Sequence, residues 1–177
     1  MWMTRFFLSN GLCAGVVALA TVFAVQATYA EDMLAPSGEV ILTVSGAIGT
    51  TNGNGVLALD ADLFATLPQH SFTTGTIWTE GTATYTGVLL RDLLAAVGAT
   101  GSTVKLTALN DYEISMPVAD ALKDGPLLAN LSDGKPMSLR EKGPIWLIYP
   151  YDTVDGYRTE QTYARSIWQL IRIAVAD

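Results

Sequence analysis

The stretch TGVLLRDLLAAVGATG, residues 86–101, predicts an amphipathic helix and decides the fold class. Its apolar side chains recur at helical spacing, Thr86 is the expected N-terminal cap, and Gly98 is a residue type that ends helices. Short segments in which apolar and polar residues alternate surround it on both sides. One clear helix among many short strands predicts an α+β fold with a mixed or mostly antiparallel sheet and few short helices.

The segments before this helix are expected to form strands and one further short helix. Strands are predicted over residues 38–48, 71–78 and 82–85. A glycine-rich loop occupies residues 49–55, and Asp60 is placed to cap a helix over residues 61–66.

The segments after the helix predict two hairpins and two strands. The first hairpin, residues 103–122, turns at Asn110-Asp111, and the second, residues 127–139, turns at Asp133-Gly134. The apolar run 143–150 indicates a buried strand. Residues 166–177 predict a closing strand, preceded by a short helical turn.

Residues 1–30 have the organisation of a secretory signal peptide. Arg5 precedes an uncharged apolar run over residues 11–27, and small residues lead up to a cleavage site after Ala30. We therefore expect a periplasmic mature chain of one domain, residues 31–177, with no membrane insertion after cleavage. A retained membrane anchor is the alternative, although the apolar run is short for a spanning helix.

The charge and cysteine content exclude several partner classes. The formal net charge is −7, and it becomes −8 when Arg5 is removed with the signal. Binding to nucleic acid or to an anionic lipid surface requires a cluster of basic residues, and the sequence contains none. The only cysteine is Cys13, so the mature chain has no disulfide and no thiolate metal ligand.

Four motifs follow one another in the order GVLLRDLL, ALNDYEISMP, LSDGKPM and KGPIWLIYP. With this order and spacing, residues 38–176 resemble the small exported proteobacterial members of the oxidoreductase molybdopterin-binding domain family. The resemblance implies a sulfite-oxidase-like fold and a molybdenum ion on a pterin dithiolene. It also implies a protein cysteine as a further metal ligand, located shortly before the helix.

At that position this chain has TTGT, residues 73–76, without a cysteine. A threonine hydroxyl is a hard oxygen donor and a poor substitute for thiolate on molybdenum. The anionic pterin pyrophosphate also requires arginines, and those that follow the signal are few and scattered. A lone histidine, His70, makes no metal site and is expected in solvent. The residues thus predict no metal and no bound cofactor, whereas the resemblance implies molybdopterin, and whether the chain is an enzyme stays open.

Candidate residues for binding a ligand or a partner come from three segments. They are Thr74, Thr76 and Trp78; Asn110, Asp111 and Tyr112; and Tyr149, Tyr151, Asp152, Tyr157 and Arg158. Tyrosine and arginine are typical of binding surfaces, and long polar loops such as residues 149–165 often carry function. Each group also has a structural interpretation, namely threonines filling a half-exposed strand, a tryptophan in the core, an ordinary hairpin turn, and tyrosines packed on a sheet edge.

Three functional hypotheses result. The first is a non-catalytic periplasmic domain that binds a small molecule or a periplasmic or membrane protein. The second is a molybdopterin-dependent oxidoreductase whose molybdenum has no cysteine ligand from the protein. The third is a cofactor-independent protein-interaction domain that uses residues 149–165.

Overall fold

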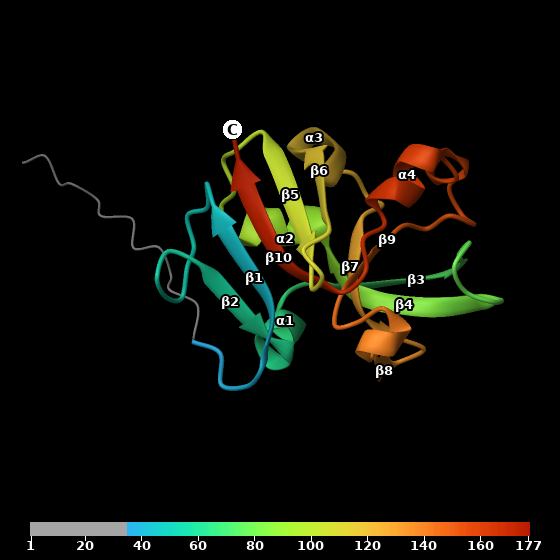
Figure 1. Ribbon diagram of the computed structural model, residues 1–177, viewed down its shortest axis with the longest axis horizontal. Coiled ribbons are helices and arrows are strands. Elements are labelled where there is room, and N and C mark those ends of the chain that lie inside the picture. The colour runs from blue at the N-terminus through green and yellow to red at the C-terminus, as the bar shows by residue number, and fades with distance from the viewer. Residues whose placement is uncertain (1–34) are drawn as a thin grey trace, which may run out of the picture.

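The computed structural model describes residues 35–177, and the expected signal peptide lies outside this range. The strands form two sheets (Figure 1). The first has the order β2-β1-β10-β5-β6. Its strands are β1 (Val40–Gly46), β2 (Leu57–Asp60), β5 (Thr103–Ala108), β6 (Glu113–Pro117) and β10 (Leu170–Ala176). Strands β1 and β10 run parallel, and the other neighbours in this sheet are antiparallel.

The second sheet is antiparallel throughout, with the order β3-β4-β7-β8 and with β9 paired to β7. Its strands are β3 (Gln69–Gly75), β4 (Thr82–Leu89), β7 (Leu127–Ser132), β8 (Lys135–Pro136) and β9 (Trp146–Ile148). The expectation of a mixed, mostly antiparallel α+β fold is therefore confirmed, with the strands divided between two sheets rather than joined in one.

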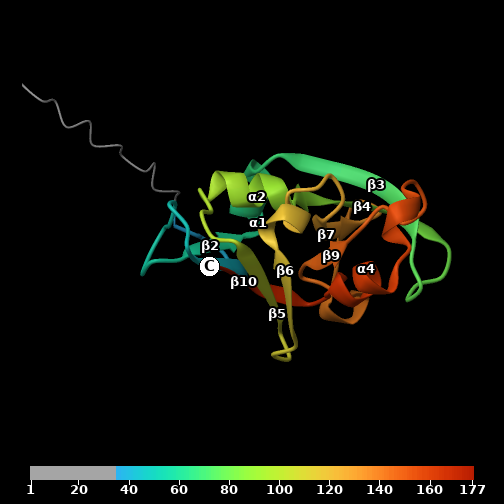
Figure 2. The ribbon, with the colours of Figure 1, turned by 90° about the horizontal axis from the view of Figure 1, so that it is seen from above.

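The helices are short. They are α1 (Ala61–Thr66), α2 (Leu90–Ala96), α3 (Val118–Ala121) and α4 (Glu160–Arg165), with 3₁₀ turns η1 (Leu139–Glu141) and η2 (Asp155–Tyr157). The predicted cap of α1 is confirmed, because the Asp60 side chain accepts a hydrogen bond from the Leu63 N–H at 2.9 Å. Helices α1 and α2 lie on the same side of the first sheet (Figure 2). Across residues 35–177, no helix is both long and apolar enough to cross a membrane.

The helix start predicted at Thr86 is wrong. Residues 86–89 continue β4, where they pair with β3 on one side and β7 on the other. Helix α2 begins only at Leu90, and its first turn has no side-chain cap. The buried Val88 and Leu89 supply apolar surface as strand residues, so pairing with two neighbouring strands overrides the helical pattern.

Other element boundaries also differ from those predicted. The strand expected over residues 71–78 starts at Gln69 and ends at Gly75. Strand β2 and helix α3 were not predicted. Both hairpins, the buried strand within residues 143–150 and the closing strand are confirmed. The loop 149–165 contains η2 and α4, so it is more ordered than its polar composition indicated.

Candidate functional site

Thr74 lies at the end of β3 and is 1% exposed. Its hydroxyl accepts a hydrogen bond from the backbone N–H of Asp152 at 3.1 Å and donates one to the Gly75 carbonyl oxygen at 3.2 Å. The Asp152 carboxylate accepts from the Gly75 N–H and from the Arg158 guanidinium, both at 2.5 Å. Three of the predicted site residues, Thr74, Asp152 and Arg158, therefore form one hydrogen-bonded network.

The hydrogen-bond donors of this network stabilise the negative charge of the Asp152 carboxylate. Hydrogen bonding from the Gly75 N–H, and then from Arg158, lowers the pKa of Asp152 below its ordinary value. The Arg158 Nε also donates to the Tyr151 carbonyl oxygen at 2.8 Å, so the guanidinium is held by two neighbouring residues. The network consequently holds the loop after β9 against the end of β3.

These residues do not fit a molybdenum centre. The Thr74 hydroxyl already donates and accepts, and it is an oxygen where soft molybdenum prefers sulfur. Residues 35–177 contain no group of three or more histidine, aspartate, glutamate or cysteine side chains placed to hold a metal ion. An arginine cradle for an anionic pterin is also lacking, since all arginines in this range except Arg140 contact a carboxylate.

Trp78 is the centre of an aromatic cluster beside this network. Its ring makes edge-to-face contacts with Trp146, Tyr163 and Trp168, at centroid distances of 5.9, 5.8 and 5.7 Å. Tyr151 lies 6.5 Å from the same ring. Trp146 is buried, as predicted, and its indole N–H donates to the Ser166 carbonyl oxygen at 3.2 Å. Trp78 is only partly buried, because it separates two surface cavities.

One of these cavities, the aromatic cleft, has a volume of about 320 Å³. It is lined by Trp78, Ala108, Asn110, Tyr112, Tyr163, Ala164, Ser166, Ile167 and Trp168. The cleft thus joins the β3–β4 turn, the β5–β6 hairpin and the segment from α4 to β10. None of its lining side chains is an acid or a base. Tyr112 is 54% exposed and Trp168 38%, so two large aromatic side chains are open to solvent at this site.

The polar groups of the aromatic cleft are partly available. The Asn110 side-chain oxygen accepts from the Tyr112 N–H at 3.2 Å, but its amide NH₂ has no partner within residues 35–177. The hydroxyls of Tyr112 and Tyr163 are likewise without a hydrogen bond to this part of the chain. The Ser166 hydroxyl is engaged, since it donates to the Thr162 carbonyl oxygen and bonds the Tyr151 hydroxyl. Aromatic walls with a few unpaired donors are the usual lining of a small-molecule site.

The structure brings some predicted residues to the aromatic cleft and leaves others elsewhere. Trp78, Asn110 and Tyr112 line it. Asp111 instead contacts Arg172 at 2.8 Å, and the Thr76 hydroxyl bonds that of Thr79 at 2.7 Å.

Of the two interpretations of the tyrosines in residues 149–165, packing rather than an exposed surface describes Tyr149 and Tyr151. Tyr149 and Tyr151 are 4% and 2% exposed, and burial raises the pKa of both hydroxyls. Tyr157 is partly buried against Tyr149 and over Gly125. These tyrosine rings of the loop therefore pack with the hydrophobic core.

Two residues of the aromatic cleft, Tyr163 and Trp168, were not predicted. Neither residue is among the candidate residues taken from the sequence, and Tyr163 lies within the segment 149–165. The sequence feature that could have identified them is their aromatic character beside a polar segment, because such side chains are enriched at binding sites.

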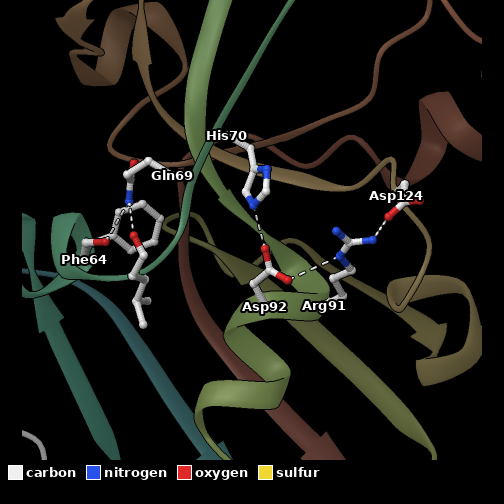
Figure 3. Close-up of polar contacts among 7 residues, drawn as sticks. Phe64, Gln69, His70, Arg91, Asp92 and Asp124 are labelled. Atoms are coloured by element: carbon white, nitrogen blue, oxygen red, sulfur yellow. Dashed lines mark hydrogen bonds and ion pairs between the residues drawn. The ribbon is translucent and has the colours of Figure 1, made fainter.

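His70 is not a free surface imidazole. Its Nε2 lies 2.7 Å from Asp92 Oδ2, and Asp92 also contacts Arg91, which pairs with Asp124 (Figure 3). Next to it, the Gln69 side chain donates to the Phe64 carbonyl oxygen at 3.1 Å. These contacts tie β3 to α1 and α2, and they account for the only histidine structurally.

Two comparisons identify relatives of this fold. Residues 60–155 match the model of a family described as oxidoreductase molybdopterin binding domain. The sulfane dehydrogenase SoxCD from Paracoccus pantotrophus matches in structure with a TM-score of 0.59 and 17% identity, over 78% of this chain and 38% of that chain. No curated protein sequence matches. The predicted sulfite-oxidase-like molybdopterin-binding fold is thereby confirmed, while the chain spans well under half the length of the SoxCD chain.

Proposed function

The chain belongs to the oxidoreductase molybdopterin binding domain family, and we propose that it acts in the periplasm as a non-catalytic binding domain without the molybdenum cofactor. The observation that carries the proposal is the state of Thr74. At the place where the resemblance implies a thiolate ligand, a buried hydroxyl accepts from the Asp152 N–H and donates to the Gly75 carbonyl oxygen. A metal bound there would have to break this network and leave the Asp152 N–H without an acceptor.

The aromatic cleft is the binding site of this proposal. Its volume is at the lower end of the range of small-ligand pockets, and three of its residues were singled out from the sequence. The lining has no basic side chain to pair with an anion, so burying an anion there would cost desolvation energy. Aromatic faces and amide or hydroxyl groups instead favour a neutral, planar small molecule that stacks on the rings and hydrogen-bonds at its edge.

Elemental analysis of the mature protein tests the absence of the cofactor. The protein would be exported from a host that makes molybdopterin, and molybdenum, tungsten and oxidised-pterin fluorescence would be measured on one sample. We expect no stoichiometric metal or pterin. About one metal and one pterin per chain would overturn the proposal and favour a molybdopterin-dependent oxidoreductase, the candidate that family membership supports.

Ligand-detected nuclear magnetic resonance tests the aromatic cleft. A set of small neutral aromatic and heterocyclic compounds would be screened against the mature protein. Hits should lose binding in Tyr112→Ala and in Trp168→Ala. They should bind Leu122→Ala normally, because Leu122 is an exposed apolar residue outside the cleft. Hits that bind both cleft variants as tightly as the wild-type protein would place the binding site outside the aromatic cleft.

A protein-interaction domain using residues 149–165 has less support. Its expected contact residues included Tyr151, which is buried, and Arg158, which is committed to Asp152. Exposed aromatic surface is instead found at Tyr112 and Trp168. A protein partner that used this domain would therefore find a better contact surface at the aromatic cleft than on the loop.

A further inference from the structure

Some lysine and arginine side chains form ion pairs with carboxylates, and others do not. The sequence has ten lysines and arginines, and nine remain when Arg5 is set aside. Six of the nine lie within 4.0 Å of a carboxylate: Arg91, Lys105, Lys123, Arg158, Arg165 and Arg172. Among residues 35–177, the three without such an ion pair are Lys135, Arg140 and Lys142.

All three unpaired bases line the second cavity beside Trp78, here named the cationic cavity, with a volume of about 540 Å³. They come from different elements, since Lys135 is in β8, Arg140 is in η1 and Lys142 follows η1. The lining also includes three aromatic residues and three carboxylates, namely Trp78, Tyr85, Trp146, Glu80, Asp133 and Glu141. With three bases and three carboxylates the lining has a formal charge of zero, in a chain whose net charge is −7.

The carboxylates at this cavity do not neutralise the bases by contact. Asp133 accepts from the Thr84 N–H at 2.9 Å. Glu141 accepts from the Ser138 hydroxyl and N–H, and these bonds lower the pKa of Glu141. Lys135 acts on Glu141 only as a more distant charge. Glu80 carries the third negative charge of the lining. All three carboxylates keep their negative charge, but none of them forms an ion pair with Arg140 or Lys135, so these two bases have no carboxylate in contact among the described residues.

The wall of the cavity offers aromatic surface. Trp78 is partly exposed on it, while Tyr85 and Trp146 form its buried floor. Lys142 is held at this wall by the rings, with its ammonium 4.7 Å from the Trp168 centroid and 5.4 Å from that of Trp146. Lys142 lines the cationic cavity and not the aromatic cleft, although its ammonium also lies over Trp168, which is a ring of the cleft.

We propose that the cationic cavity binds a small organic anion, a carboxylate attached to a planar group, which is distinct from the neutral ligand of the aromatic cleft. The Arg140 guanidinium has the fork geometry that binds a carboxylate through two parallel hydrogen bonds, and Lys135 adds a second positive charge. The planar part of the anion packs against Trp78. This site does not depend on whether the aromatic cleft is occupied.

Calorimetric titration with benzoate tests the assignment, and neutral benzamide serves as the matched ligand of the same shape. The titrations compare the two ligands in the Tyr112→Ala variant, because neutral benzamide is also a ligand of the type expected in the aromatic cleft. We expect saturable one-to-one binding of benzoate and weaker binding of benzamide. Arg140→Gln and Lys135→Gln should each weaken benzoate binding about tenfold, as expected for loss of a charged hydrogen bond. Two controls should bind benzoate normally: Lys123→Gln, which removes the same charge at a residue outside the cavity lining, and Tyr112→Ala, which alters the lining of the aromatic cleft.

Three outcomes would overturn the proposal. One is the absence of saturable benzoate binding. Another is equal affinity of the Tyr112→Ala variant for benzamide and benzoate, because the cavity would then not distinguish a charged ligand from a neutral one. The third is equal weakening in Lys123→Gln, which would reduce the effect to the overall charge of the protein. Circular dichroism of each variant establishes that it is folded. Lys135 and Arg140 lie on separate elements, so a single local folding defect would not explain weaker binding in both variants.

Discussion

The backbone N–H of Asp152 donates to the hydroxyl of Thr74, and the two residues are 78 positions apart in the sequence. This bond joins the end of β3 to the loop after β9. The Asp152 carboxylate strengthens the junction by accepting from Gly75 on one side and Arg158 on the other. A position expected to supply a metal ligand is therefore used here to hold two segments of the chain together.

Thr74→Val should destabilise the protein by about 1–2 kcal/mol. Valine has nearly the shape of threonine but no hydroxyl, so the Asp152 N–H loses its acceptor in a partly buried position. Urea unfolding of the mature protein measures the change. Thr73→Val is the matched control, since its hydroxyl bonds Thr84 on an exposed face, and it should change stability by less than about 0.5 kcal/mol. Equal losses in the two variants would contradict the role given to Thr74.

Asp152→Asn should remove a stabilisation that depends on pH. Gly75 and Arg158 lower the pKa of Asp152 in the folded state, so the ionised carboxylate favours folding. A group with a lowered folded pKa stabilises above its unfolded pKa, about 3.9, and loses this contribution as the pH falls through the folded value. The melting temperatures of the two proteins should therefore differ most near pH 7 and converge below about pH 4. A difference that stays constant down to pH 3 would show that the charge of Asp152 is not involved.

Export should produce a mature chain that begins at Glu31. The apolar run over residues 11–27 and the small residues before the cleavage site predict processing after Ala30. N-terminal sequencing of protein released from the periplasm measures this directly. Ala30→Arg should block processing and leave the chain attached to the membrane fraction, because the peptidase requires a small residue at this position. Detection of unprocessed wild-type chain in the membrane would instead favour a retained anchor.

Local features of the fold could be predicted from the sequence. The Asp60 cap of α1 and the turns of both hairpins depend on residues within a few positions of one another, so the sequence contains the whole signal. Residues 86–89 show the limit. Their apolar pattern suits a helix or a buried strand equally, and pairing with β3 and β7 decided between the two.

The binding sites were harder to predict for the same reason. Trp78, Asn110 and Tyr112 could be singled out as residue types that bind ligands, but their meeting with Trp168 depends on the packing of three separate elements. The sequence shows no basic cluster, yet Lys135, Arg140 and Lys142 line one cavity. These three bases differ from the other basic residues in having no ion-pair partner among the described residues. Ion pairs between residues far apart in the sequence cannot be predicted from local sequence patterns.

Gly87→Ala should destabilise the protein by about 1–3 kcal/mol through overpacking. A Cβ atom at Gly87 would clash with the Leu128 carbonyl oxygen and the Ala129 Cα of the neighbouring strand β7, at the point where the pairing register of β4 and β7 shifts. Backbone atoms of a central strand cannot move aside cheaply. Gly156→Ala has open space around the new methyl group and should be nearly neutral. Thermal unfolding of both variants measures the contrast, and a neutral Gly87→Ala would mean that β4 and β7 are farther apart than described.

Trp146→Ala and Trp168→Ala should separate the core from the aromatic cleft. Trp146 is buried and donates to the Ser166 carbonyl oxygen, so its removal leaves a large cavity and an unpaired acceptor and should cost about 3–5 kcal/mol of stability. Trp168 is partly exposed at the mouth of the cleft, so its removal should cost much less stability while abolishing ligand binding there. Urea unfolding and ligand-detected nuclear magnetic resonance on the same two variants test whether Trp146 serves stability and Trp168 serves ligand binding. A Trp168→Ala variant as unstable as Trp146→Ala would make Trp168 a core residue, and the aromatic cleft would lose the ring on which its ligand is expected to stack.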